Sequence, residues 1–117
     1  MITSMHSIVY ASDADAARSF FRDVIGLPYV DAHDGWLIFK QPPSELAVHP
    51  APDPIGKHEL YLMCDDIEQT MAELTARGAE FTLPVTQAGF GLVTSISVPG
   101  GGEIGLYQPR HRTAYDL

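Results

Sequence analysis

The chain has 117 residues, 45% of them hydrophobic and 19% charged, which is typical of one folded domain and excludes a disordered segment. Fifteen acidic and seven basic residues give a formal charge of −8 at pH 7, so we expect neither a nucleic acid nor a membrane surface as partner. The single cysteine, Cys64, allows no intrachain disulfide, and no secretion signal or long apolar run is evident, so we expect a cytoplasmic protein.

The first half predicts a strand, a helix and three more strands. Residues 5–11 are β-prone, and Asp13 follows them as a helix N-cap. Apolar residues in pairs four apart then define one helix face as far as Gly26, which is expected to end the helix. Three short strands are expected at residues 29–32, 36–40 and 45–49.

The second half predicts the same order of elements. Residues 58–64 form an apolar strand, and Asp65 and Asp66 precede a helix that ends at Gly78. A loop is expected at residues 84–91. The remaining strands are expected at residues 80–83, 92–98 and 103–108.

The two halves share the spacing of their helix signals. Asp13 lies thirteen residues before Gly26, Asp65 lies thirteen before Gly78, and a histidine lies seven residues before each aspartate. This repeat predicts two βαβββ modules in a single domain. We therefore expect an α+β fold, in which a curved mixed sheet surrounds a cavity and the helices lie on its convex side. The modules are expected at about residues 1–50 and 57–109.

Three stretches resemble the vicinal oxygen chelate superfamily, which contains glyoxalase I, the extradiol dioxygenases and the bleomycin-resistance proteins. They are HSIVYASD at residues 6–13, FFRDVIGL at residues 20–27 and PGGGEIGLY at residues 99–107. The resemblance covers nearly the whole chain and implies the same fold, assembled as a homodimer. It also implies a small organic molecule as partner.

In metal-dependent members of this superfamily, side chains from the first and last strands of each half hold a divalent cation. His6 falls on the first of these positions. The second lies on residues 45–49, where strand alternation leaves Glu45 or His49 toward the cavity.

The third metal position is His58 by the internal repeat and Glu59 by the family spacing. We favour Glu59, because Tyr61 would then face the cavity with it while the more apolar residues pack against the helix. The fourth position is Gly105, where the metal enzymes carry a glutamate, so a complete four-ligand site is not expected. We expect no required cofactor, or a weakly bound Zn, Ni, Mn or Fe ion held by His6, Glu45 and Glu59.

Aromatic side chains and one histidine are expected to line the ligand cavity, because such sites are mostly apolar with a few polar groups. Phe90, between two glycines, is either a lid or packs on the sheet, and Cys64 is interpreted as a buried, inert thiol. His33 and His111 are expected to be exposed. The candidate ligand-binding residues are Tyr10, Trp36, His49, Tyr61, Phe90 and Tyr107.

Two functions follow from the resemblance and the residues. The first is a binding protein that sequesters a small organic ligand without a full metal site, which Gly105 and the acidic composition favour. The alternative is a divalent-metal-dependent lyase, isomerase or dioxygenase acting on a small oxygenated substrate. We assign no catalytic residue.

Overall fold

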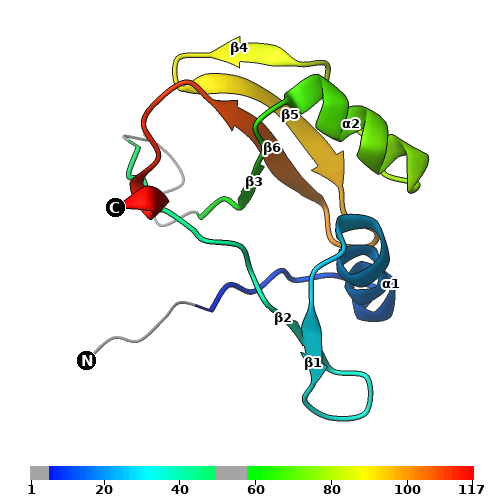
Figure 1. Ribbon diagram of the computed structural model, residues 1–117. Helices are drawn as coiled ribbons and strands as arrows, with labels where there is room; N and C mark the ends of the chain where they lie inside the picture. Colours follow the sequence, from blue (N-terminus) through cyan, green and yellow to red (C-terminus); the bar gives the residue numbers. More distant parts are fainter. Residues whose placement is uncertain (1–5, 50–57) are drawn as a thin grey trace.

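The computed structural model describes residues 6–49 and 58–117 and shows an α+β fold with two sheets (Figure 1). Strands β1 and β2 pair antiparallel, and a second, curved sheet has the order β3-β6-β5-β4 and does not close into a barrel. Within the described residues, no helix is long and apolar enough to cross a membrane. The elements are α1 (Ala14–Ser19), η1 (Phe20–Ile25), β1 (Tyr29–Asp31), β2 (Leu37–Phe39), β3 (Tyr61–Met63), α2 (Ile67–Ala76), β4 (Thr86–Ala88), β5 (Gly91–Ser97), β6 (Glu103–Pro109) and η2 (Ala114–Asp116).

The N-terminal helix begins and ends where its capping residues predict. The Asp13 carboxylate accepts a hydrogen bond from the Ala16 N–H at 3.0 Å. The helix starts as the α-helix α1 and continues as the wider π-helix η1. Gly26 ends it with a φ of 80°, in the left-handed region that glycine adopts without strain.

The second helix, α2, follows the same capping logic. The Asp66 carboxylate accepts from the Gln69 N–H at 3.1 Å, so Asp66 and not Asp65 is the N-cap. Gly78, with a φ of 99°, follows the last turn. Both helices predicted from the sequence are therefore confirmed.

Both helices pack on one face of the four-stranded sheet (Figure 1). Because successive side chains of a strand point to opposite faces, Ile104 and Leu106 of β6 face the helices, while Gly105 and Tyr107 face the other side. That other side carries the candidate site. We name it the helix-free face, because neither α1–η1 nor α2 packs on it; of the described helical elements, only the short 3₁₀ turn η2 lies on this side. The buried hydrophobic core consists of Ala17, Phe20, Ile67, Leu74, Ala79, Ile96, Val98, Ile104 and Leu106.

Two strands expected in the first half are wrong. Residues 6–11 and 45–49 contain no strand in the structure. Leu46 and Val48 are 79% and 89% exposed, so the alternating apolar pattern at residues 45–49 packs against no sheet of this chain. The apolar and polar residues at 45–49 do alternate as in a strand, but a strand also needs a hydrogen-bonded neighbour, and the described residues provide none for this segment.

The second half differs from its prediction in three places. The strand expected at residues 58–64 is shortened to β3, and the one expected at residues 80–83 is reduced to a single bridge between Phe81 and Ile96. The loop expected at residues 84–91 instead contains β4, which pairs with β5. Its polar sequence, Thr-Gln-Ala, lacks the apolar pattern by which a strand is recognised.

Candidate functional site

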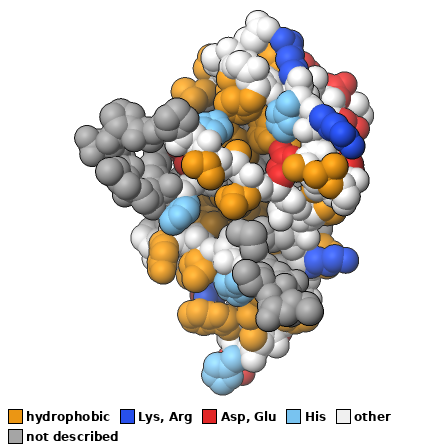
Figure 2. Space-filling view, turned by 90° about the vertical axis from the view of Figure 1, so that its left-hand side faces the viewer, with side chains coloured by type: hydrophobic (Ala, Val, Ile, Leu, Met, Phe, Trp, Pro, Cys, Tyr) orange, Lys and Arg blue, Asp and Glu red, His pale blue; other side chains and the backbone are white. Residues whose placement is uncertain are grey.

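Three aromatic rings meet on the helix-free face of the sheet. They belong to Tyr61 of β3, Tyr107 of β6 and Phe90 in the turn between β4 and β5, and we name them the aromatic cluster. Their centroids lie 5.4 to 6.4 Å apart and the planes are nearly perpendicular, which is a favoured edge-to-face arrangement. The His49 ring contacts Phe90 at 5.9 Å. Hydrophobic and histidine side chains gather on the face turned toward the viewer in Figure 2.

The register of the parallel pair β3 and β6 produces this cluster. Tyr61 lies opposite Gly105, and Met63 lies opposite Tyr107. A Cβ added at Gly105 would overlap the Tyr61 ring, so only glycine leaves room for the ring at this position. Gly105 stands where the metal enzymes carry a glutamate. Here it leaves the space that the Tyr61 ring occupies.

A carboxylate adjoins the aromatic cluster. The Tyr107 hydroxyl donates to Oε1 of Glu45 at 2.9 Å, and the Ala114 N–H donates to Oε2 at 2.7 Å. The His111 Nε2 lies 3.8 Å from the same carboxylate and 3.5 Å from the Tyr107 hydroxyl. The Glu45 side chain is only 13% exposed.

These contacts shift the acidities at the site in opposite directions. The hydrogen bonds from Ala114 and then from Tyr107 lower the pKa of Glu45, which is therefore a carboxylate at neutral pH. Burial, followed by the bond to Glu45, raises the pKa of Tyr107 to about 12. Burial and a hydrogen bond to Glu59 raise the pKa of Tyr61. The site thus presents acidic side chains, Glu45 and Glu59, beside neutral phenols.

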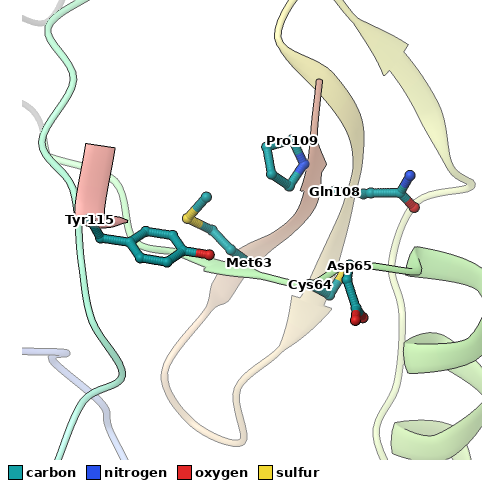
Figure 3. Close-up of a pocket in the computed structure, with 6 residues that line it drawn as sticks. All are labelled: Met63, Cys64, Asp65, Gln108, Pro109 and Tyr115. Atoms are coloured by element: carbon teal, nitrogen blue, oxygen red, sulfur yellow. The ribbon is translucent and has the colours of Figure 1, made fainter. Parts of the chain in front are cut away.

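A pocket of about 570 Å³ opens beside the aromatic cluster, between the ends of β3 and β6 and the C-terminal turn η2 (Figure 3). Its volume is in the range of small-molecule sites. Met63 connects the pocket with the aromatic cluster, because it lines the pocket and lies opposite Tyr107 in the strand register. The lining residues are Met63, Cys64, Asp65, Gln108, Pro109 and Tyr115.

Cys64 has the environment of an unreactive thiol. Its Sγ lies 3.6 Å from the Tyr107 carbonyl oxygen and the side chain packs partly against the core. Burial raises the pKa of this thiol, which keeps it protonated at neutral pH.

The structure brings together four of the six predicted ligand-binding residues, namely His49 and the aromatic cluster. Tyr10 is 86% exposed, and the Trp36 ring instead lies 4.5 Å from the Arg18 guanidinium. Phe90 packs on the sheet. His33 and His111 are exposed, as predicted. The His111 ring nevertheless lies 6.1 Å from that of Tyr107, a contact that no local pattern signals.

The predicted metal ligands do not converge. His6 is exposed, and both oxygens of Glu45 already accept hydrogen bonds. Glu59 faces the helix-free side, as expected, since Leu60 and Leu62 pack against the core, but it is hydrogen-bonded to Tyr61. Across residues 6–49 and 58–117 no three histidine, cysteine or acidic side chains are grouped as a metal site would require. The residues present do not fit the four-ligand site of the metal enzymes.

The sequence matches the Glyoxalase/Bleomycin resistance protein/Dioxygenase superfamily over residues 4–106. The chain therefore belongs to this superfamily, as its resemblance to the vicinal oxygen chelate proteins predicted. No curated protein matches it.

Solved structures of the same fold include proteins of different function. TnmS3, an antibiotic binding protein from Streptomyces sp. CB03234, is 26% identical with a TM-score of 0.66, and the match covers 93% of this chain and 98% of TnmS3. A lactoylglutathione lyase from Agrobacterium tumefaciens is 23% identical with a TM-score of 0.63, covering 91% and 92% of the two chains. A glyoxalase family protein from Enterococcus faecalis is 20% identical with a TM-score of 0.66, covering 90% and 96%.

Proposed function

We propose that the protein binds a small organic molecule on the helix-free face of the sheet and holds it without a full metal site. The observation that carries this proposal is the aromatic cluster beside the 570 Å³ pocket, because aromatic rings next to a cavity lined by both polar and apolar side chains suit a small organic guest. The similarity to an antibiotic binding protein supports it.

The charge of the protein favours a cationic guest. The chain carries a formal charge of −8, and the Glu45 carboxylate lies at the edge of the aromatic cluster. Such a field attracts cations and repels anions. The scattered metal donors, and the Tyr61 ring above Gly105, are our reasons for preferring binding to the metal-dependent lyase, isomerase or dioxygenase.

The proposal is tested with a set of three aromatic probes of similar shape, 2-phenylethylammonium, 2-phenylethanol and phenylacetate. Two-dimensional ¹H–¹⁵N NMR on protein dialysed against EDTA should show shifts at Tyr61, Phe90 and Tyr107. Phe90→Ala should weaken binding several-fold, because it removes one wall of the aromatic cluster. Leu83→Ala, at a 56% exposed leucine that lines neither pocket, is the control and should leave binding unchanged. If no probe shifts these signals, the proposal is overturned.

We also propose that the protein is a cytoplasmic homodimer. Much of the first half exposes large apolar side chains, and a second pocket of about 380 Å³ lies on the hairpin of β1 and β2. A second copy of the chain would cover this surface. The exposed residues include Tyr29, Val30, Trp36, Ile38, Leu46 and Val48.

Light scattering coupled to size-exclusion chromatography should give twice the 12.8 kDa mass of the chain. Val30→Lys, on the exposed side of β1, should shift the protein toward the monomer, because it places a charge in the proposed interface. A monomer at all concentrations would contradict the dimer.

A further inference from the structure

The last residues of the chain fold back onto the candidate site. We name residues 111–117 the C-terminal strap. They contain the short turn η2, and none of their side chains is buried. Leu117 is 89% exposed and Tyr115 is 40% exposed. The strap is therefore fastened mainly by polar contacts, and in Figure 1 it lies on the side of the sheet opposite the two helices.

The main fastening point is Glu45. A carboxylate that is only 13% exposed needs hydrogen-bond donors to offset the loss of water. Tyr107, a member of the aromatic cluster, supplies one donor, and the Ala114 N–H of the strap supplies the other. The Ala114 N–H carries no formal charge, whereas a protonated nitrogen brings a full positive charge and forms an ion pair with the carboxylate in addition to the hydrogen bond.

We infer that a guest with a protonated nitrogen takes the place of the Ala114 N–H at Glu45 and displaces the C-terminal strap. This inference rests on the proposed function and names the class of its ligand, an aromatic or apolar amine. The apolar part of the guest lies against the aromatic cluster and its ammonium group pairs with Glu45. Because Tyr115 of the strap lines the neighbouring pocket, the displacement also widens the space available to the guest.

Ala114→Pro isolates the contact of the strap. Proline removes the N–H donor but suits this position, since residue 114 is the first of η2 and the preceding Thr113 has the extended φ of −81° and ψ of 134°. In Ala114→Pro, 2-phenylethylammonium should bind about tenfold more tightly, because it no longer competes with the strap. Binding of 2-phenylethanol should tighten much less, because an uncharged hydroxyl forms no ion pair with the freed carboxylate.

Glu45→Gln tests the carboxylate itself. This variant should bind 2-phenylethylammonium no better than 2-phenylethanol. Glu73→Gln, at an exposed glutamate of α2, makes the same chemical change away from the site and should keep the preference of the wild type.

In the wild-type protein, 2-phenylethylammonium but not 2-phenylethanol should move the amide signals of residues 114–117 toward disordered positions. If both probes shift the aromatic cluster equally, the strap signals do not move and Ala114→Pro has no effect, the inference is overturned while the proposed function stands. If neither probe shifts the aromatic cluster in any variant, the proposed function fails first.

Discussion

The two halves of the chain carry similar sequence signals but use them differently. In the second half, β3 to β6 form a four-stranded sheet whose apolar face is covered by the helices. In the first half, β1 and β2 form an isolated hairpin, and the segments on either side of it expose apolar side chains (Figure 1). Two isoleucines on strands illustrate the contrast: Ile96 of β5 is 0% exposed, whereas Ile38 of β2 is 38% exposed.

This difference shows that an apolar strand pattern predicts burial of one face but does not indicate which surface will cover that face. The second half satisfies its pattern within the chain. In the first half the apolar side chains stay exposed within the chain. We propose that a second copy of the chain covers them. The division into modules at residues 1–50 and 57–109 stays a prediction of the internal repeat.

The largest expected effect compares the two isoleucines directly. Ile96→Ala should cost about 3 kcal/mol of unfolding free energy, since it leaves a cavity between the sheet and the helices. Ile38→Ala should cost less than about 1 kcal/mol, because its side chain is already partly in water. Urea denaturation in the Val30→Lys background, which is expected to be monomeric, measures both. Equal costs would show that the two halves do not differ in this way.

The next effect concerns Gly105, which leaves room for the Tyr61 ring. Gly105→Ala should cost about 1–3 kcal/mol, because the added methyl group overlaps that ring. Gly89→Ala, where a new Cβ meets no atom within 4 Å, is the control and should cost much less. Tyr61→Ala should relieve most of the cost of Gly105→Ala in a double-mutant cycle, and additive costs would mean that the two positions do not interact.

A smaller effect depends on pH. The lowered pKa of Glu45 means that its ionised form stabilises the folded protein above the ordinary value of 4.5, and that this contribution is lost as the pH falls through the folded-state pKa. The groups facing Glu45 are Tyr107, His111, Asp116 and the Ala114 N–H. The difference in melting temperature between wild type and Glu45→Gln should thus narrow as the pH falls below about 4.5. A difference that grows in acid would contradict this assignment.

The smallest expected effect is that of added metal. Nickel, cobalt, zinc, manganese or ferrous iron at tens of micromolar should raise the melting temperature little, because the candidate ligands do not converge. His6→Ala should remove whatever shift there is. A stoichiometric metal in protein purified without chelator, lost with an activity in His6→Ala, would favour the enzyme alternative.

Much of the fold could be predicted from local signals. Asp13 and Gly26 marked the first helix correctly, since capping depends on a few neighbouring residues. The alternation along β3 correctly placed Leu60 and Leu62 toward the core. The strands at residues 6–11 and 45–49 failed because pairing depends on a distant partner that a local pattern does not reveal.

The candidate site was predictable only where it lies on regular strands. Tyr61 and Tyr107 follow from alternation and register. His111 does not, because it reaches Glu45 only through a turn of the chain after β6. From the sequence, Gly105 is recognised only as a missing metal ligand. The structure shows that it makes room for the Tyr61 ring, a relation that depends on the register of β3 and β6.

The central claim is that the aromatic cluster holds an organic guest without a metal. The most direct measurement is a set of nuclear Overhauser effects between the ring protons of 2-phenylethylammonium and protein dialysed against EDTA. We predict contacts to Tyr61, Phe90 and Tyr107. Contacts confined to the β1–β2 hairpin, or binding that appears only when a divalent metal is restored, would contradict the claim.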